Sequence, residues 1–337
     1  MPYNNAMSHP QILIPFSLPP AEHAKDLVKM LASETGADGL ALLLARNKSR
    51  KITRFDDFSR LLPHEDWLSK YAIEQKQPSQ LLQLASQLGV RLSAGYWFIF
   101  NPIHLHIASN HLVLTDQRQL NLSDSDAQQL FNKAQALCSE VGIELVYGSP
   151  STWFLRGDDW SDFVTASPDA ACGHNIEIWS AKGSKELAWR KLQNEIQMEW
   201  FIHPVQEQRA MQREKPVNGA WLWGGTQIGT AFIPNPTNAA ASKPTSIEQF
   251  IQAPQLLVLD QLSEAALAGD WSTWAAQLIE LEKNWLKPLA QALKSGQLKQ
   301  CNLYLSHSSA LMRLELSRSA LRQFWHSPSL KPLITPI

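Results

Sequence analysis

A helical pattern broken by a His-Pro step is the feature that most constrains the fold of this 337-residue chain. Apolar residues recur near a 3.6-residue period over 185–202, which predicts one helix of roughly four to five turns. His203-Pro204 ends this helix, because proline lacks an N–H donor and restricts the residue before it. Pro204 also suits the first position of a second helix, VQEQRAMQRE. GAWLWGG (219–225) then predicts a short strand that runs into a glycine turn.

Strand and helix patterns alternate along the rest of the chain, and this order is typical of α/β proteins. Residues 47–76 are polar without a clean period, so we expect irregular structure with short helices there. Residues 233–247 are rich in Pro, Ala and Ser and predict an exposed loop or linker. The expected strands lie within 11–18, 96–116, 144–157, 255–260 and 301–307, and the expected helices lie at 21–34, at 124–141 with Ser123 as N-cap and Gly142 after the last turn, and at 271–296.

Length, charge and cysteine content exclude several classes of protein. A chain of this length favours two lobes over one core. The charged fraction is 18% and the formal net charge is -1, so we expect neither a nucleic-acid partner nor a membrane surface. Three widely spaced cysteines and the lack of a signal-like start predict a cytoplasmic protein. Most of the thirteen Trp residues should fill the core or lobe interfaces.

Few residues form a motif that carries chemistry. The usual nucleophile elbow, P-loop and dinucleotide fingerprints do not occur. His104 and His106 would share one face of a strand, with His111 across a turn, so they can form a metal site or be ordinary half-buried strand residues; we favour the second interpretation. Cys172 and His174 can pair as nucleophile and base, but a loop with a buried thiol is favoured.

Arg209 and Arg213 lie four residues apart on the predicted second helix. Their guanidinium groups would then face one side and suit a phosphate or carboxylate. Alternatively, they are surface arginines that bridge to Glu207 or Glu214. The amide of Asn218 can satisfy main-chain groups in a turn.

The stretch HPVQEQRAMQREKPVNGAWLWGG (203–225) resembles the HPVN-x-x-R-x-x-x-G-x-x-x-AN-x-x-W-x-WG segment of archaeal-type cofactor-independent phosphoglycerate mutases, members of the alkaline phosphatase superfamily. It is more similar still to the RpfE-type regulatory protein family. NPIHL (101–105), WFLRG (153–157) and NEIQM (194–198) match this family in order, so the resemblance spans about residues 95 to 230. Gln206 replaces the Asn of HPVN, and the Gly expected before the Pro-Val-Asn turn is absent from Glu214-Lys215. The residues retained are His203, Pro204, Arg209, Pro216, Asn218, Trp221, Trp223 and Gly224.

The C-terminal third resembles the last core segment of the superfamily, but without its metal ligands. Counted back from Gly269-Asp270, the expected Asp falls on Ser263 and the expected His on Leu267. The terminal Asp-His becomes Ser306-His307, and ILIPFSLPP, the first strand, supplies no acid. Ser and Leu cannot replace Asp and His as ligands of a divalent ion. The resemblance therefore implies neither a metal nor another cofactor, and no catalytic residues.

The sequence as a whole predicts an α/β protein with a degenerate alkaline-phosphatase-like core and an inserted mutase-like lobe. We expect residues 1–95 and 233–337 to form the core and residues 96–232 to form the lobe and hinge. The expected function is non-catalytic, regulatory or scaffolding, through binding of a protein or of a small phosphorylated or carboxylate ligand. The alternatives are a metal-dependent mutase or phosphatase and a structural partner whose exposed tryptophans form an interface. The binding or hinge residues are His203, Arg209, Arg213, Asn218, Trp221, Trp223 and Gly224, and the mutase alternative would draw its ligands from His104, His106, Asp116, Asp260 and His307.

Overall fold

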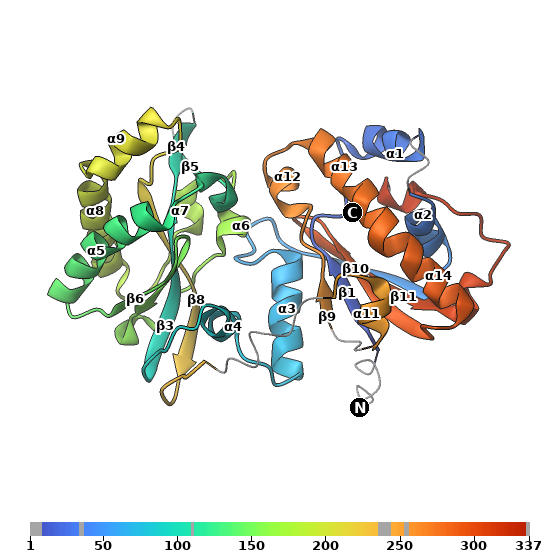
Figure 1. Ribbon diagram of the computed structural model, residues 1–337, viewed down its shortest axis with the longest axis horizontal. Helices are drawn as coiled ribbons and strands as arrows, with labels where there is room; N and C mark the ends of the chain where they lie inside the picture. Colours follow the sequence, from blue (N-terminus) through green and yellow to red (C-terminus); the bar gives the residue numbers. More distant parts are fainter. Residues whose placement is uncertain (1–8, 34–36, 109–110, 235–243, 253–255, 335–337) are drawn as a thin grey trace. The chain divides into compact units, whose positions relative to one another are not determined.

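The chain folds into two compact units, each with its own sheet and helices, in a computed structural model (Figure 1). The α/β fold class predicted from the sequence is therefore confirmed. The first unit comprises Met1–Asp57 and Ser242–Ile337, and the second comprises Phe58–Ala241. The second unit thus includes residues 58–95, and the core and lobe boundaries expected at residues 95 and 232 remain a prediction. The structure describes residues 9–33, 37–108, 111–234, 244–252 and 256–334.

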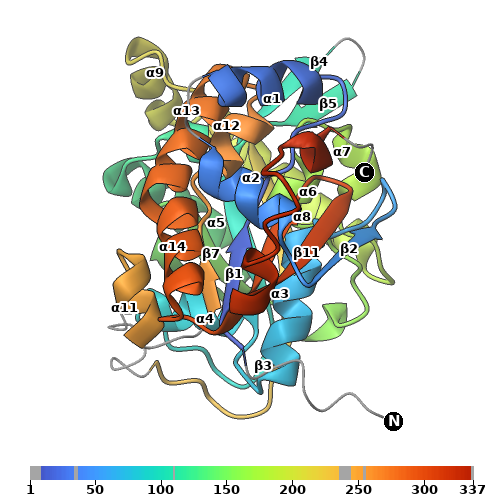
Figure 2. The same cartoon turned by 90° about the vertical axis from the view of Figure 1, so that its right-hand side faces the viewer.

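The first unit is built on a five-stranded sheet of order β2-β11-β10-β1-β9. β1 lies between β9 and β10 and runs parallel to both, while β11 and β2 extend the sheet antiparallel beyond β10. Figure 2 shows β2 beside β11 at the rim of the sheet. The strands are β1 Gln11–Ile14, β2 Ser49–Arg54, β9 Leu256–Val258, β10 Gln300–Ser306 and β11 Ala310–Ser317.

Helices of the first unit pack against this sheet (Figure 1), and the strand residues Ile12, Leu303 and Met312 are all buried. Glu282 begins a π-helical turn inside the long C-terminal helix, and its buried carboxylate accepts from the N–H groups of Gly39 and Leu40 at 2.6 and 2.9 Å. The helices are α1 Ala24–Ser33, α2 Asp38–Ala45, α11 Ile247–Gln252, α12 Ser263–Leu267, α13 Trp271–Leu281, η3 Glu282–Leu286, α14 Lys287–Ser295, α15 Arg318–Leu321 and η4 Lys331–Leu333.

The second unit is built on an antiparallel sheet of order β6-β7-β3-β8, with a separate hairpin of β4 and β5. β3 and β8 pair from Gly95 opposite Ile228 to Ile103 opposite Gly219, with one bulge. The strands are β3 Gly95–Ile103, β4 Leu105–Ala108, β5 His111–Leu114, β6 Leu145–Ser149, β7 Thr152–Arg156 and β8 Gly219–Ile228.

Two long helices, α5 and α8, lie side by side on the sheet of the second unit (Figure 1). Between helices and sheet, Phe100 stacks on Trp153 at 5.3 Å, and Trp200 donates its indole N–H to the carbonyl of Leu130. Ten of the thirteen tryptophans in the chain are buried, as the sequence predicts. The helices are α3 Pro63–Glu74, α4 Gln80–Gln87, η1 Gln117–Leu120, α5 Asp124–Glu140, η2 Asp158–Trp160, α6 Pro168–Ala171, α7 Ile176–Trp179, α8 Glu186–Phe201 and α9 Pro204–Met211.

Two predictions of local structure are wrong. Residues 47–76 contain the helix α3, in line with the short helices expected there, but Ser49–Arg54 form the strand β2 rather than irregular structure. Gly224 and Gly225 do not form a turn after a short strand: β8 continues through them to Ile228 and absorbs them in the bulge. Of the loop expected at 233–247, residues 235–243 lie outside the described residues. None of the described helices is long and apolar enough to cross a membrane.

Candidate functional site

The segment from His203 to Gly224, here called the turn segment, joins α8 to β8 through α9. His203 is the N-cap of α9, and its ring accepts from the N–H of Val205 at 3.3 Å. Pro204 occupies the first helical position, where its missing N–H costs nothing. The His-Pro step thus ends one helix and begins the next, as the sequence predicts.

Arg209 binds the turn segment from inside. Its side chain is 1% exposed, and its Nε donates to the carbonyl of Lys215 at 2.9 Å. A terminal nitrogen donates to the carbonyl of Leu120, and the guanidinium lies 3.7 Å from the carboxylate of Asp126. Burial lowers the pKa of Arg209, and Asp126 partly offsets this effect. Arg209 is therefore occupied in joining α9 to the start of α5.

Arg213 does not share a helix face with Arg209, which corrects the sequence prediction. α9 ends at Met211, and Arg213 stands exposed on the following turn with φ of 60°. The surface bridge to Glu207 or Glu214 is also wrong for Arg209, because that side chain is buried. The two guanidinium groups therefore do not form the paired anion site that their spacing suggests.

Two carboxamides complete the turn segment by pairing with main-chain groups. Asn218 accepts from the N–H of Leu105 at 2.7 Å and donates to its carbonyl at 2.8 Å. Gln206 accepts from the N–H of Val217 at 3.1 Å and donates to its carbonyl at 2.8 Å. Gln206, which replaces the Asn of the related motif, therefore keeps a defined structural role.

The tryptophans of β8 anchor the end of the turn segment in the core. Trp221 donates its indole N–H to the carbonyl of Ala166 at 2.9 Å. Trp223 is 8% exposed and donates to the side-chain oxygen of Asn101. Gly224 has φ of 68°, and a Cβ there would lie 3.0 Å from Ile99, so any other residue would be strained at this bulge.

The strand ends of the first unit offer poor metal ligands. Ser306 ends β10 and is fully buried; its hydroxyl accepts from the N–H of Phe16 at 3.0 Å. The carbonyl of Phe16 in turn accepts from the indole of Trp274 at 2.8 Å. Ser263 is buried at the start of α12, and Leu267 has no donor atom. These side chains do not supply the charged or strong lone-pair ligands that a divalent ion prefers.

The residues of the alternative ligand set divide between the two units: His104, His106 and Asp116 lie in the second, and Asp260 and His307 lie in the first. Within each unit its members have other neighbours: the ring of His104 bonds to the carbonyl of Pro216 at 2.9 Å, and Asp116 bonds to Arg118 at 2.8 Å. Asp260 is exposed, and the ring of His307 lies 3.3 Å from the hydroxyl of Ser309. His104 also lies between β3 and β4, rather than within one strand with His106. In the part of the chain that the structure describes, no three His, Cys, Asp or Glu side chains could hold a metal ion together.

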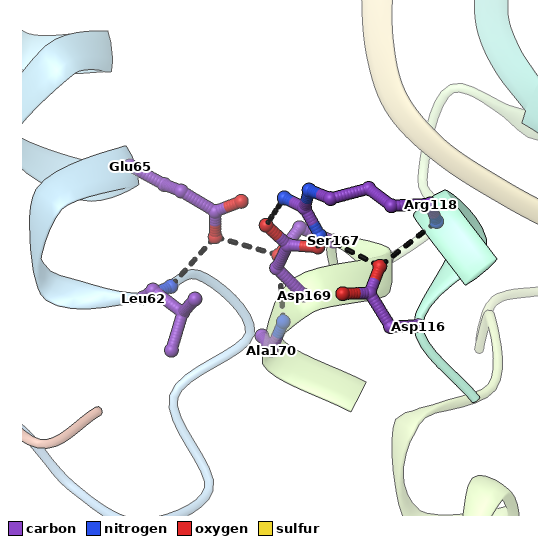
Figure 3. A network of polar contacts seen from close by, with 7 residues as sticks. All are labelled: Leu62, Glu65, Asp116, Arg118, Ser167, Asp169 and Ala170. Atoms are coloured by element: carbon purple, nitrogen blue, oxygen red, sulfur yellow. Dashed lines mark hydrogen bonds and ion pairs between the residues drawn. The ribbon is translucent and has the colours of Figure 1, made fainter. Parts of the chain in front are cut away.

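A polar network in the second unit was not predicted from the sequence (Figure 3). Arg118 bridges two carboxylates, Asp116 at 2.8 Å and Asp169 at 2.6 Å. Glu65 accepts from the hydroxyl of Ser167 at 2.6 Å and from the N–H of Leu62 at 2.8 Å. Burial and the nearby Asp169 raise the pKa of Glu65 to about 7. The only local signals are two helix starts, Leu62-Pro63 and Ser167-Pro168, and they do not reveal that the two starts meet.

Cys172 is half-buried beside this network, and its thiol is not poised as a nucleophile. Burial and the carboxylate of Asp116 raise its pKa to about 12, so the thiol stays protonated near neutral pH. The ring of His174 packs 5.6 Å from that of Trp179. This environment agrees with the interpretation of Cys172 as a structural thiol.

Comparisons with known proteins give similarity to solved structures alone. No family model matches the chain, and no curated protein matches it. A cofactor-independent phosphoglycerate mutase from Thermoplasma acidophilum is 12% identical with a TM-score of 0.37, over 97% of this chain and 95% of that one. The PH0037 protein from Pyrococcus horikoshii is 14% identical with a TM-score of 0.41, over 92% of this chain and 87% of that one. Likeness at this level carries no information on catalysis or ligands.

Proposed function

We propose that this chain is a non-catalytic, phosphoglycerate-mutase-like protein that acts by binding, in a regulatory or scaffolding role of the RpfE type. The observation that carries the proposal is the state of Ser306, where the resemblance expects an acidic metal ligand. Its hydroxyl is buried and accepts from the N–H of Phe16. A neutral hydroxyl engaged in this way supplies no negative charge to a metal ion, and two-metal phosphoryl transfer depends on such charge.

The surface beside the turn segment favours a protein partner over a small anion. Arg209 is buried and hydrogen-bonded to carbonyls, so Arg213 remains as the accessible guanidinium of this pair. Phe201 and Ile202, at the end of α8, are 78% and 73% exposed. Exposed apolar side chains that gather in this way are typical of protein-binding surfaces. With Asn218 they line a groove of about 530 Å³, together with Leu105, Leu112, Asn194, Gln197 and Met198.

In this proposal residues 96–232 form the binding lobe and hinge, and 1–95 with 233–337 form the core that carries it. His203, Trp221, Trp223 and Gly224 hold the lobe in shape and take no part in a reaction. The cytoplasm is the proposed place of action, because the three cysteines are free thiols in the structure, as expected in a reducing compartment.

The test of the non-catalytic part pairs elemental analysis of the purified protein with a coupled assay of 2- and 3-phosphoglycerate interconversion. The assay is run with and without added manganese, beside an active cofactor-independent mutase as positive control. We expect no stoichiometric metal and no turnover above background. Stoichiometric metal together with manganese-dependent turnover would overturn the proposal and support the mutase alternative.

The test of the binding part separates the two ligand classes. Calorimetric titration with 3-phosphoglycerate and with inorganic phosphate, on wild type and Arg213→Ala, detects a small-anion site. We expect no saturable binding of either compound. Recovery of a protein from a lysate by the wild type, and its loss on Phe201→Glu with Ile202→Glu, would then support the protein-binding role. Saturable phosphate binding that Arg213→Ala abolishes would assign the small-anion role instead.

A further inference from the structure

We propose that the outer edge of β2, in the first unit, docks an extended acidic segment of a partner protein as an added strand. This surface is separate from the turn segment, so the inference does not depend on the function proposed above. It would hold equally for a catalytic protein. Three kinds of observation support it: an open sheet edge, local positive charge, and a loop with exposed aromatic rings next to the strand.

β2 presents an open edge for strand addition. It is the outermost strand, paired on one side with β11, and every residue from Ser49 to Arg54 is exposed. Phe55, just beyond β2, donates its N–H to the carbonyl of the opposite residue Ser309 at 2.8 Å. Because hydrogen-bonded pairs alternate in an antiparallel ladder, the main-chain groups of Arg50 and Ile52 point away from β11. These groups are available to an incoming strand.

Positive charge is concentrated along this edge although the chain as a whole is nearly neutral. Residues 46–54 carry five Lys or Arg side chains and no carboxylate, against a net charge of -1 for the whole chain. Within the described part of the chain, Lys48, Arg50 and Lys51 take part in no ion pair. The nearest acids along the sequence are Asp56 and Asp57, beyond the end of the strand. An acidic partner would find unpaired cations here.

A pair of like charges on neighbouring strands also supports the binding of an acidic strand. Lys51 lies directly opposite Arg313 on β11. Directly opposed like charges destabilise a sheet unless an anion neutralises them. The carboxylate of Glu315 lies 3.0 Å from Arg313 and forms no other ion pair among the residues that the structure describes. A carboxylate from an added strand would neutralise the second cation, Lys51.

A loop with two exposed aromatic rings lies next to β2. Arg46 donates to the carbonyl of His326 at 2.7 Å and to those of Leu321 and Phe324 at 3.3 and 3.4 Å. The loop so held exposes Phe324 and Trp325, which are 79% and 64% exposed. Arg50 and Trp325 line one hollow of about 580 Å³. A peptide side chain that pairs with Arg50 can therefore also contact an aromatic ring.

An extended peptide fits these features better than a nucleic acid, because its main chain can pair with the open edge of β2. Phosphates would use the cations but would leave the N–H and C=O groups of Arg50 and Ile52 unpaired. Positive charge on an edge strand can also serve only to prevent pairing between sheets. That role predicts that β2 binds no peptide.

The experiment measures binding of a fluorescein-labelled peptide, in which Glu and Thr alternate, to the full chain by fluorescence anisotropy. We expect saturable binding. Arg50→Glu with Lys51→Glu should weaken it by at least about tenfold. Lys283→Glu with Lys294→Glu, the same charge change at exposed sites away from β2, should leave the Kd unchanged. Ile52→Pro removes an outward N–H at a position where an edge strand tolerates proline, and should weaken binding while circular dichroism stays unchanged.

Other outcomes overturn the inference. Absence of saturable binding leaves β2 as a strand whose charges prevent pairing. If a peptide methylated at every second main-chain nitrogen binds as tightly as the unmethylated peptide, the peptide is attracted by charge and adds no strand. The same conclusion follows if Ile52→Pro leaves the Kd unchanged. An oligothymidylate of equal charge that binds as tightly as the peptide, and is insensitive to Ile52→Pro, assigns the surface to nucleic acid. The methylated peptide keeps the test decisive if Ile52→Pro does not fold.

Discussion

Asn218 pairs with Leu105 as one strand residue pairs with another. Its amide oxygen accepts from the N–H of Leu105 at 2.7 Å, and its amide nitrogen donates to the carbonyl of the same residue at 2.8 Å. Its own N–H donates to the carbonyl of Ile103. The side chain of Asn218, just before the first residue of β8, thereby extends the strand pairing by one position. It also fixes the place where β4 begins after β3.

Asn218→Asp should destabilise the second unit because it replaces the donor to Leu105 with a second acceptor. Leaving the half-buried carbonyl without its donor, opposite a negative charge, should lower the free energy of unfolding by roughly 1–3 kcal/mol near neutral pH. The loss should shrink below the pKa of the new carboxyl, since a protonated Asp can donate to Leu105 again. Urea unfolding over a pH series measures both effects. Asn194→Asp, the same change at an exposed position on α8, should be silent, and an equal loss in both variants would contradict the structural role.

Local sequence patterns predicted the helices whose ends are set by residues close to them in the sequence. Ser123 caps α5 through the N–H of Asp126, and Gly142 after that helix has φ of 74°. α8 and the start of α9 at Pro204 follow the apolar period and the proline. Each of these depends on neighbours in the sequence, so a pattern can show it.

The parts that escaped prediction depend on distant segments. β2 shows no apolar alternation because both of its faces are exposed, and its partner β11 lies more than two hundred residues away along the chain. Arg209 and Arg213 have helical spacing, but the position where α9 ends, rather than the spacing, decides that only Arg209 is buried. Ser167 and Glu65 meet across 102 residues, and the sequence carries no sign of that meeting.

Arg209→Lys should be strongly destabilising although it preserves charge. Lysine has one nitrogen in place of the planar fork, so it cannot serve the carbonyls of Lys215 and Leu120 together. We expect a loss of roughly 2–4 kcal/mol in the free energy of unfolding, from at least one orphaned carbonyl and a misplaced buried charge. Arg213→Lys is the matched change on the exposed turn and should cost less than about 0.5 kcal/mol. Similar melting temperatures for the two variants would show that Arg209 does not bind the segment together.

Trp223→Ala should remove a large packed side chain and leave Asn101 without its indole donor. Trp223 is 8% exposed, so the cavity should cost roughly 3–5 kcal/mol. His203→Ala removes the N-cap of α9 and should cost roughly 1 kcal/mol. Trp325→Ala is the control, since that ring is 64% exposed. Melting temperatures measured by circular dichroism test whether Trp223→Ala loses most stability, His203→Ala less and Trp325→Ala least. A Trp223 variant as stable as wild type would mean that the ring does not anchor β8.

Glu65 should make stability depend on pH in the direction opposite to that of most carboxylates. Its pKa is raised from 4.5 to about 7, so between these values the folded chain holds a proton that the unfolded chain has released. The free energy of unfolding contributed by Glu65 is therefore highest at low pH and falls as pH rises through this window, by roughly 1–3 kcal/mol in all. His64, whose pKa burial lowers to about 4, contributes the reverse slope between that value and 6.5.

Comparison of wild type with Glu65→Gln separates the two slopes, because His64 is present in both. The amide oxygen can still accept from Ser167 and Leu62, so the variant keeps both hydrogen bonds and loses only the titration. Urea unfolding at pH 5 and pH 8 should show that Glu65→Gln is at least as stable as wild type at pH 8 and gains no stability relative to it at pH 5. The ion pair of Arg118 and Asp169 lies beside the same carboxyl in both proteins, so it does not mask the difference. A variant that loses equal stability at both pH values would show that Glu65 acts in the folded protein as an ordinary ionised carboxylate.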